Sequence, residues 1–316
     1  MLHHNISNQD STNSLLIRLI GHFLLVRPVQ LVWFDVLMGF STIVVISRGM
    51  PPISASFFVL CSVLADAGAC TFNDVGDYES DLLSSERSRN ERPLIRGLVT
   101  KKAATIQGIL LSTSSLLISL FFVYPYFTII CLILILWSFQ YSFPPLRMDA
   151  RPIFSQLFWA IFGVLSFIAI STFLEKNITS TLIDSAPYLL FLIFYSVSGE
   201  TLTKDIRDYE NDHLSGKRTT VVKFGPEICT KAAGVFIFLG TISWMGVFFY
   251  YRIHWLILFP FIAIMGGSLA FFWTLIRQLM RQYRKDTARL FHRGYIWSMT
   301  ILCLLTAVGI TITPNL

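Results

Sequence analysis

Two short segments of the chain carry aspartates at the same spacing, a pattern suited to metal and phosphate chemistry. The two rows are Asp74, Asp77 and Asp81 and, 131 residues later, Asp205, Asp208 and Asp212. Positions i, i+3 and i+7 lie on one face of a helix, so each segment predicts a row of three carboxylates. Like charges repel, and a divalent cation relieves that repulsion. Magnesium is the expected ion, because it prefers oxygen ligands and usually binds through a few carboxylates together with substrate phosphates.

The two rows belong to longer segments that are related to each other. Residues 73–81 and 204–212, aligned without gaps, are identical at five of nine positions. Asn73 precedes the first row and adds an oxygen to the predicted metal ligands. A solvated acidic helix end explains one row alone, but two matching rows favour an internal repeat whose carboxylates face each other across a cavity. Neither segment has the D-x-D-x-D-G pattern of a calcium-binding EF-hand loop.

Basic residues near both rows are suited to phosphate oxygens, because guanidinium and ammonium groups form charge-assisted hydrogen bonds with phosphate. The residues predicted to bind a diphosphate are Arg92, Arg147, Lys204, Lys217 and Arg218, with Arg87 and Arg89 as alternatives to Arg92. The excess of positive charge in cytoplasmic loops is a competing, purely topological explanation for each of them.

The composition indicates whether these segments belong to a water-soluble protein or to a membrane protein. Of the 316 residues, 54% are hydrophobic and only 14% are charged, and the mean hydropathy is +0.62. A soluble domain has roughly a quarter of its residues charged, so we expect lipid to surround this chain. The five cysteines form no CxxC pair and are expected to be small buried hydrophobes rather than zinc ligands or disulfides.

Nine apolar runs are long enough to cross a membrane, so the sequence predicts an all-α, polytopic membrane protein with about nine helices. The runs cover residues 28–46, 54–73, 103–123, 126–143, 153–174, 184–203, 230–250, 254–276 and 294–313. One domain is expected over residues 15–316, preceded by a disordered polar tail over residues 1–14. The second and sixth runs lead into the two aspartate rows, which therefore lie on the same side of the membrane.

The distribution of basic residues predicts which side of the membrane each loop faces. With nine spans, 22 of the 25 lysines and arginines fall on the side of the N-terminus, and only Arg48, Lys176 and Arg252 fall on the other side. The positive-inside rule therefore predicts a cytoplasmic N-terminus, cytoplasmic aspartate rows and a C-terminus on the opposite side. Because topology explains the net charge of +6, we expect no nucleic-acid partner.

Two further polar positions lie close to the expected cavity. Tyr141 ends the fourth run just before Pro144 and Pro145, which stop the helix near the cavity mouth. Asp66 lies seven residues before Asn73 on the same helical face, about 10 Å deeper. An intramembrane carboxylate is costly, so Asp66 is a candidate for orienting an acceptor or steering a cation. A buried hydrogen bond to a neighbouring helix explains Asp66 equally well.

These motifs resemble those of the UbiA superfamily of intramembrane prenyltransferases. The matching residues are N-D-x-x-D-x-x-x-D at 73–81, Arg92-Pro93-Leu94-x-x-Gly97, Tyr141-Ser142-x-Pro144-Pro145-Leu146-Arg147, Lys204-Asp205 through Asp212, Gly216-Lys217-Arg218-Thr219, Phe224-Gly225 and Arg27-Pro28. The nine-span topology extends the resemblance over nearly the whole chain. The sequence departs from the family pattern twice. The stretch between Asp81 and Arg92 is longer, and Met148-Asp149-Ala150 stands where more basic character is expected.

The resemblance implies a central cavity and a mechanism. Asp74, Asp77, Asp205 and Asp208 would act with Mg²⁺, which neutralises the diphosphate of a prenyl substrate and makes it a better leaving group. The allylic C–O bond then breaks, and apolar helices keep water away from the resulting carbocation. The ring of Tyr141 would stabilise that cation. An acceptor, expected to be aromatic, attacks the cation and loses a proton.

The sequence leaves two other functions open. A terpene cyclase of the same superfamily would use the same aspartates but trap the cation with the double bonds of the substrate itself. A transporter also combines internal repeats with intramembrane acids. Its binding residues, however, are expected near the midplane of the membrane rather than at one face.

Overall fold

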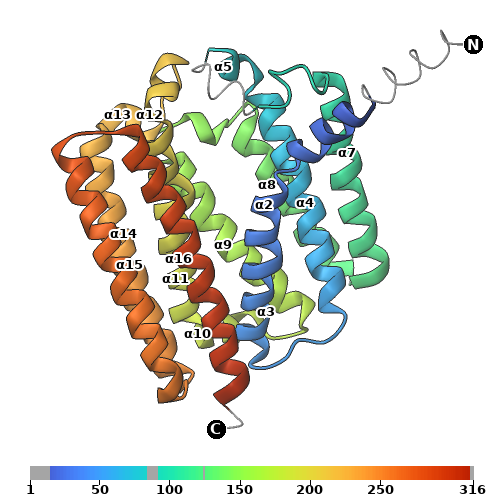
Figure 1. The fold of residues 1–316 in the computed structure, drawn as a ribbon. Coiled ribbons are helices and arrows are strands. Elements are labelled where there is room, and N and C mark those ends of the chain that lie inside the picture. The colour runs from blue at the N-terminus through green and yellow to red at the C-terminus, as the bar shows by residue number, and fades with distance from the viewer. Residues whose placement is uncertain (1–14, 84–91, 124, 314–316) are drawn as a thin grey trace, which may run out of the picture.

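Helices form all the regular secondary structure of residues 15–83, 92–123 and 125–313, which the computed structural model describes (Figure 1). The predicted tail, residues 1–14, and Arg87 and Arg89 lie outside these ranges. The first elements are α2 (Pro28–Leu31), η1 (Val32–Met38), α3 (Gly39–Ser47), α4 (Ala55–Gly76), α5 (Tyr78–Leu82), α7 (Lys101–Ile118), η2 (Ser119–Val123), α8 (Pro125–Ser142) and η3 (Met148–Ala150). The remaining elements are α9 (Phe154–Phe173), α10 (Ile178–Asp184), α11 (Ala186–Ser196), η4 (Val197–Thr203), α12 (Lys204–Leu214), α13 (Thr220–Phe224), α14 (Pro226–Tyr250), α15 (Trp255–Arg281) and α16 (Lys285–Ile312).

Eight helices within the described residues are long and apolar enough to span a membrane, and a ninth span results if one bent pair is counted together. That pair joins Ile178–Asp184 to Ala186–Leu214 at an angle of 76°. Pro187 lies in the first turn of α11, where its ring is accommodated, but an unbroken helix from α10 would clash with that ring. The prediction of an all-α, polytopic protein is therefore confirmed.

The first span is longer than the sequence predicts. Helical residues extend from Leu15 to Ser47 rather than over 28–46. The helix breaks where Arg27 adopts a left-handed conformation, with φ 50°, immediately before Pro28 at the start of α2. This break turns the Arg27 side chain toward the end of α4, where it donates to Asn73 Oδ1 at 2.9 Å.

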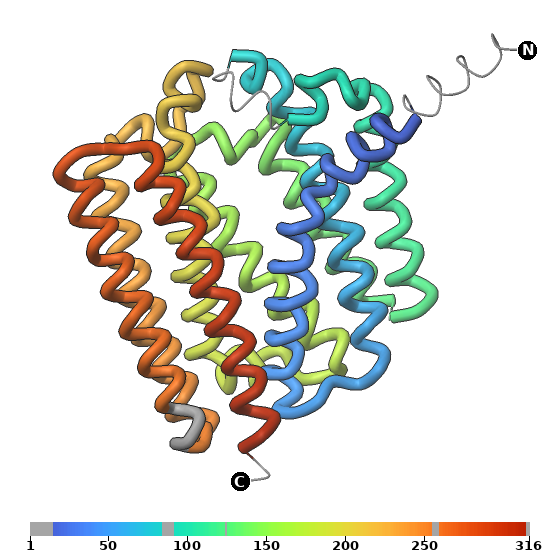
Figure 2. The backbone as a smooth tube through the Cα atoms, in the orientation of Figure 1, coloured from blue at the N-terminus to red at the C-terminus, as the bar shows by residue number. Residues whose placement is uncertain are grey.

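The long helices form a closed ring (Figure 2). Around the first half of the ring, α3 packs against α4, α4 against α8, α8 against α9, and α9 against α11. Around the second half, α11 packs against α14, α14 against α15, and α15 against α16. α16 then packs against α3 and η1, so the last helix closes on the first span. α7 lies outside the ring, against α4.

Both aspartate rows lie at the same end of the bundle. α5, α12 and α13 occupy that end, whereas α10 and the end of α16 lie at the opposite end (Figure 1). The described chain begins at the first of these ends and finishes at the other, as the nine-span topology predicts. The sequence repeat therefore corresponds to two segments that the fold brings to one level of the bundle.

π-helical turns interrupt two spans beside this end. η1 lies in the first span, and η4 leads directly into α12. A π turn inserts one extra residue into a helix and is frequent at functional sites. The turn in η4 carries Glu200, and the turn in η1 carries Trp33 and Phe34. All three side chains line the cavity described below.

Candidate functional site

A cavity of about 880 Å³ lies within the helix ring at the end that carries the aspartate rows. Side chains from α2, η1, α4, α5, α8, η4, α12 and α16 line it, together with Asp149 of η3. Aromatic side chains from the first three turns of α9 line its deeper part, namely Phe158, Trp159 and Phe162. The cavity therefore has polar walls near the loops and apolar walls further into the bundle.

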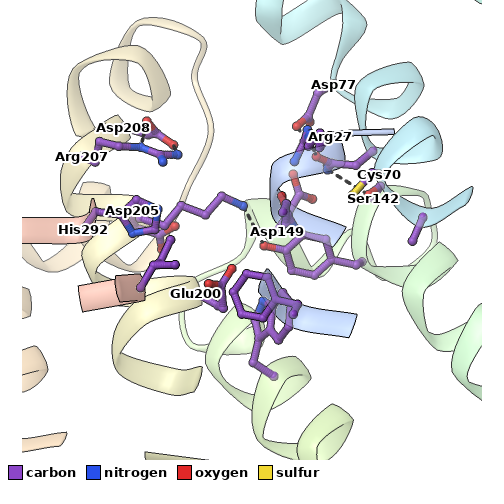
Figure 3. Close-up of a pocket in the computed structure, with 18 of the residues that line it drawn as sticks. Arg27, Cys70, Asp77, Ser142, Asp149, Glu200, Asp205, Arg207, Asp208 and His292 are labelled. Atoms are coloured by element: carbon purple, nitrogen blue, oxygen red, sulfur yellow. Dashed lines mark hydrogen bonds and ion pairs between the residues drawn. The ribbon is translucent and has the colours of Figure 1, made fainter. Parts of the chain in front are cut away.

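Most predicted site residues line this cavity. They are Asp66, Asn73, Asp77, Asp81, Arg92, Tyr141, Lys204, Asp205, Asp208, Asp212 and Lys217. Figure 3 shows Asp205 and Asp208 on one side of the cavity and Asp77 on the other. The two rows thus reach one cavity from helices that are far apart in the sequence. Three predicted residues, Asp74, Arg147 and Arg218, are not part of the lining.

Asp74 lies behind the cavity wall rather than on it. Its side chain is 5% exposed, and its Oδ1 accepts hydrogen bonds from Arg27 Nη2 and, at 2.9 Å, from Arg92 Nη1. Arg27 and Arg92 both line the cavity. The carboxylate fixes two cavity cations, and the catalytic role of Asp74 stays a prediction. A direct contact of Asp74 with a metal stays a prediction.

The first row is not one continuous helix. α4 ends just before Asp77, which occupies the junction with φ −87° and ψ −1°, and α5 begins just after it. These angles lie in the right-handed helical region, so Asp77 and Asp81 still face the same cavity. Asn73 fixes the junction, because its Nδ2 donates to Ser142 Oγ at 3.1 Å. The prediction of a single helical row is wrong for this segment.

The second row does lie on one continuous helix, α12. Both oxygens of Asp208 accept hydrogen bonds from Arg207, at 2.8 Å from Nε and 2.6 Å from Nη2. Asp205 is 7% exposed, and its Oδ2 is buried without a hydrogen-bond donor among the described residues. An unpaired buried carboxylate oxygen is costly. Asp205 therefore offers the cavity a carboxylate oxygen that gains from binding a cation.

Lys217 connects the two aspartate segments across the cavity. It follows the second row in the sequence, yet its Nζ donates to Asp77 Oδ1 of the first row at 2.7 Å. The same Nζ donates to Asp149 Oδ2 at 3.1 Å. The Lys217 side chain is 13% exposed, so these contacts are largely shielded from water. An ion pair therefore connects the first row to the loop that follows the second row.

Asp149 is a site residue that the motifs did not reveal. It lies in η3, where the family pattern predicts more basic character, and it lines the cavity with 8% of its surface exposed. Its carboxylate accepts a hydrogen bond from Lys217 Nζ, which also donates to Asp77. The acidic departure from the family pattern is explained by this lysine, which needs a second carboxylate to hold its position.

Burial and neighbouring charges shift the ionisation of the groups in the loops. Burial raises the pKa of Asp81 to about 6, although Arg92 opposes the shift. Burial also acts to raise the pKa of Asp77, but the Lys217 ammonium outweighs it and holds that pKa below its usual range. Burial acts to lower the pKa of Lys217, and the carboxylates of Asp77 and Asp149 raise it overall. Lys217 therefore stays protonated near neutral pH and is available to an anion.

Replacing Asp149 by asparagine is expected to lower kcat/KM for a prenyl diphosphate about tenfold, as for the loss of one charge-assisted hydrogen bond. Asparagine keeps the shape of the side chain but removes the charge that restrains Lys217. The rate of diphosphate release at varied prenyl diphosphate concentration measures the effect. We expect the KM for the acceptor to stay unchanged, and wild-type kinetics in Asp149→Asn would remove Asp149 from the site.

Tyr141 lies opposite the second row and contacts Lys204. Lys204 Nζ donates to the Tyr141 hydroxyl at 3.3 Å and lies 5.5 Å from the centre of its ring. Phe158 packs against the same ring, with 4.6 Å between ring centres. The contact links the end of α8 to the start of α12 across the cavity. The ring of Tyr141 already attracts a cation, which is the property that carbocation stabilisation requires.

Two carboxyl groups lie in the apolar part of the cavity. Asp66 on α4 lines it, as predicted, and Cys70 Sγ lies 3.9 Å from Asp66 Oδ2. Asp35 from η1 lies beside Asp66. Glu200 from η4 is 7% exposed and also lines the cavity, although sequence reasoning gave it no role in the site. Carboxyl groups from two spans therefore line the deeper cavity, and Asp35 of a third span lies next to Asp66.

Arg147 and Arg218 are placed outside the cavity lining. Arg147 Nη2 lies 3.7 Å from Asp77 Oδ1 and supports that carboxylate from outside. Arg218 is exposed. Gly216, with φ 72°, and the side-chain cap that Thr219 provides to α13 turn the chain between α12 and α13. This turn directs Lys217 inward and Arg218 outward, and the phosphate contact of Arg218 stays a prediction.

The last helix contributes cavity residues that sequence reasoning missed. These residues of α16 are Arg289, His292, Arg293, Ile296 and Trp297. His292 is 6% exposed, and its Nδ1 lies 3.0 Å from Thr203 Oγ1. The spacing i, i+3, i+4, i+7 and i+8 marks one helical face, and that spacing is the signal that would have found them. Their charges had been attributed to topology alone.

The oxygen atoms of the cavity fit Mg²⁺ that protein and substrate bind jointly. Within the described part of the chain, no three His, Cys, Asp or Glu side chains are close enough to hold an ion by themselves. Mg²⁺ usually takes one or two carboxylates and completes its shell with water and substrate phosphates. Asp77 and Asp81 on one wall and Asp205 and Asp212 on the other supply such ligands.

Comparisons with known proteins agree with the motifs. The profile of the UbiA prenyltransferase family matches residues 32–302. A digeranylgeranylglyceryl phosphate synthase from Pyrococcus horikoshii is 26% identical over 208 residues, which cover 66% of this chain and 70% of that protein. A UbiA homolog from Archaeoglobus fulgidus bound to GPP and Mg²⁺ superposes with a TM-score of 0.66 at 19% identity, covering 92% of this chain and 99% of that chain. The same homolog bound to DMAPP and Mg²⁺ gives a TM-score of 0.65, also at 19% identity, covering 92% and 98%.

The solved structures share the fold of this chain, with helices arranged as an integral, multi-pass membrane protein. The matched profile extends from η1 into α16 and includes both aspartate segments, Tyr141 and Lys217. The match covers most of the helix ring, which confirms the resemblance seen in the sequence. The chain belongs to the UbiA prenyltransferase family.

Proposed function

We propose that this prenyltransferase is a Mg²⁺-dependent enzyme that ionises an isoprenoid diphosphate inside the membrane and transfers the prenyl group to an acceptor. The observation that carries the proposal is the Lys217–Asp77 hydrogen bond of 2.7 Å, which joins both aspartate segments around one cavity. The relatives named as digeranylgeranylglyceryl phosphate synthases and the homolog bound to GPP and Mg²⁺ support the same chemistry.

The cations at the polar end of the cavity are arranged to bind a diphosphate. Arg27 and Arg92 are held by Asp74, and Lys217 is held by Asp77 and Asp149. When a diphosphate enters the cavity, its phosphate oxygens replace the carboxylate oxygens as hydrogen-bond partners of these cations. Both kinds of partner are negatively charged. The carboxylates keep the three cations in place before binding. Little reorganisation is then needed as negative charge develops on the leaving group.

The carboxylates that face the cavity would hold Mg²⁺ between the two walls. The proposed ligands are Asn73, Asp77, Asp81, Asp205, Asp208 and Asp212. When bound, the ion draws negative charge from the diphosphate and makes it a better leaving group. Asp208 must first exchange its contact with Arg207, whereas the unpaired oxygen of Asp205 needs no exchange.

The apolar part of the cavity is suited to the prenyl chain. Phe158, Trp159 and Phe162 from α9 form its wall next to Tyr141. These rings exclude water, which would otherwise capture the allylic cation. The face of Tyr141 and the neighbouring rings stabilise the cation electrostatically until an acceptor attacks. Asp66 in the same region is the proposed carboxylate for orienting that acceptor or steering the cation.

The bundle end that carries the site is proposed to face the cytoplasm. This orientation places 22 of the 25 lysines and arginines on the cytoplasmic side and keeps the C-terminus on the opposite side. A charged diphosphate substrate then reaches the cavity from water, while its isoprenoid chain lies at membrane depth. In this orientation the polar part of the cavity opens toward water, and its apolar part lies at the depth of the lipid.

The proposal is tested with the purified full-length chain in detergent or liposomes. C10 to C20 prenyl diphosphates are supplied with Mg²⁺, with and without a panel of acceptors, and the products are identified by mass spectrometry. Transfer predicts a prenylated acceptor and an equimolar amount of released diphosphate. A cyclic hydrocarbon formed without any acceptor would instead identify a terpene cyclase. Accumulation of the unreacted prenyl diphosphate inside liposomes would identify a carrier.

A further inference from the structure

A second cavity lies at the end of the bundle opposite the aspartate rows. It measures about 460 Å³ and is lined by Arg48, Tyr250, Tyr251, Arg252, Ile310 and Thr313. These residues belong to the end of α3, the end of α14 with the turn that follows it, and the end of α16, and Figure 1 shows α3 and the last turns of α16 at this end. None of the six lines the first cavity, so we treat this one as a separate site and name it the far cavity.

The far cavity collects the positive charge of a region that is otherwise poor in it. By the nine-span topology, only Arg48, Lys176 and Arg252 of the 25 lysines and arginines fall at this end. Arg48 and Arg252 line the cavity. Lys176 Nζ donates to the carbonyl oxygen of Ile46, two residues before Arg48, at 3.0 Å. The positive-inside rule accounts for the charge at the other end of the bundle but not for this group of cations.

Both arginines of the far cavity have backbone conformations that arginine rarely adopts. Arg48, which ends α3, has φ 59°, and Arg252, in the turn after α14, has φ 50°. Positive φ values are uncommon outside glycine and cost conformational energy. A cation also stabilises the C-terminus of a helix, which explains one charge at each helix end but not why two of them line one cavity. The two side chains are therefore candidates for binding a ligand.

The two guanidinium groups differ in how they are held. Arg48 Cζ lies 5.9 Å from the ring centre of Tyr250 and 5.7 Å from that of Tyr251. Its Nη2 lies 3.6 Å from Asp184 Oδ2, an exposed ion pair that contributes little. The Arg252 side chain is exposed and forms no ion pair within residues 15–83, 92–123 and 125–313. Arg48 is thus positioned by the two rings, and Arg252 is available to an anion.

Apolar surface continues from the far cavity onto the outside of the bundle. Phe249 at the end of α14 is exposed, as are Val308 and Ile312 on the last turns of α16. The backbone N–H of Arg252 donates to the carbonyl oxygen of Phe249 at 3.3 Å, so this surface adjoins the cavity. Exposed apolar side chains of a membrane protein contact lipid chains, and tyrosines such as Tyr250 are typical of the membrane interface. The surroundings therefore suit a ligand with an anionic group and apolar chains.

We propose that the far cavity binds the phosphate group of an anionic phospholipid from the leaflet at this end of the bundle. Guanidinium groups bind phosphate in a bidentate manner, and Arg48 and Arg252 would contact it from two sides of the cavity. α16 packs against α3, and the backbone N–H of His254 donates to Thr313 Oγ1 at 3.1 Å. The bound phosphate would therefore join the elements that close the helix ring. This lipid stabilises the fold and is not a substrate, so the inference does not depend on the proposed prenyl transfer.

Thermal unfolding of the purified full-length chain in a neutral detergent tests the proposal. The probes are dioctanoyl phosphatidylglycerol, which is anionic, dioctanoyl phosphatidylcholine, whose phosphate is balanced by choline, and inorganic phosphate. We expect phosphatidylglycerol at about ten times its Kd to raise the Tm by about 3 °C, and the other two probes to leave it unchanged. Arg252→Gln should need about tenfold more phosphatidylglycerol for the same rise, and the Arg48→Gln/Arg252→Gln double variant about 100-fold more. Arg252→Lys should restore part of the affinity.

Native mass spectrometry supplies a second measurement, in which the double variant should retain one phosphatidylglycerol fewer than wild type. The matched control is Arg281→Gln, which removes the same charge from an exposed position at the other end of the bundle, outside both cavity linings. This control should respond to phosphatidylglycerol as wild type does. A loss of binding in Arg281→Gln as large as in Arg252→Gln would mean that general charge attraction holds the lipid.

Other outcomes also overturn the inference. Equal responses of wild type and double variant to phosphatidylglycerol exclude the far cavity as the site. An equal rise in Tm with inorganic phosphate would replace the lipid by free phosphate, and an equal rise with phosphatidylcholine would remove the role of the arginines. A double variant that is destabilised equally with and without phosphatidylglycerol would show that the arginines serve only the helix ends. No prenyl diphosphate is present in these measurements, so their failure leaves the proposed function untouched.

Discussion

Replacing Asp77 by asparagine is expected to lower the rate of diphosphate release about 100- to 1,000-fold, the usual effect of removing one preorganised electrostatic group. Asp77 lines the cavity, and its Oδ1 accepts the hydrogen bond from Lys217. Asparagine has the same size but carries no charge. The substitution therefore removes a proposed metal ligand and loosens the lysine that joins both rows. Diphosphate release from a prenyl diphosphate, followed in single-turnover and steady-state experiments, measures the effect.

The control for this prediction is Asp184→Asn at the other end of the bundle. Asp184 lies 3.6 Å from Arg48 and its side chain is 51% exposed, so the same chemical change there tests only general effects on the protein. Asp205→Asn on the second wall should match Asp77→Asn, since both walls are needed. If Asp77→Asn released diphosphate as fast as Asp184→Asn, the assignment of the first row to the chemistry would be wrong.

The helical architecture and the meeting of the two rows could be predicted because both depend on local patterns. Apolar runs identify spans through their length alone, and the Asp-x-x-Asp spacing identifies a helical face. The repeat added the decisive constraint, since equal positions in the topology place Asp77 and Asp205 at one membrane face. The structure contains the expected cavity there, with both side chains in its lining.

The exact role of each charged side chain could not be predicted, because it depends on partners that are distant in the sequence. Asp74 and Asp77 look equivalent in the motif, yet Arg27 and Arg92 draw the first away from the cavity wall. Nothing near Asp149 in the sequence indicates that Lys217, 68 residues later, will bind it. Motif spacing indicates which face a residue occupies, but not which partner neutralises it.

The helical irregularities were also beyond sequence patterns. A π turn changes the phase of a helix by one residue, and apolar content does not reveal such a change. Trp33 in η1 and Glu200 in η4 therefore reach the cavity from positions that a regular helix does not indicate. Arg289 and Arg293 were overlooked for a different reason. The positive-inside rule alone accounts for their charge, so charge does not distinguish them from the other basic residues of the cytoplasmic loops.

The balance of charge inside the cavity bears directly on the need for metal. Its lining contains eight carboxyl groups and seven lysine or arginine side chains. The carboxyl groups are Asp66, Asp77, Asp81, Asp149, Glu200, Asp205, Asp208 and Asp212, and the basic residues are Arg27, Arg92, Lys204, Arg207, Lys217, Arg289 and Arg293. A prenyl diphosphate adds about three negative charges near neutral pH. With all of these groups ionised, the protein alone therefore does not neutralise its proposed substrate, whereas two divalent ions would.

Removal of divalent cations is accordingly expected to stop diphosphate release to below about one hundredth of the rate with Mg²⁺, in line with the catalytic effect of a bound ion. The purified chain is treated with EDTA, assayed, and assayed again after Mg²⁺ is restored. Recovery of the rate with Mg²⁺ shows that the chain itself was not damaged. In the Asp77→Asn and Asp205→Asn variants, half-maximal activity should require more Mg²⁺ than in wild type, because each variant lacks one ligand oxygen with full charge. Undiminished release in EDTA would mean that the cavity cations alone neutralise the diphosphate, and that the first aspartate row serves only to position Arg27, Arg92 and Lys217.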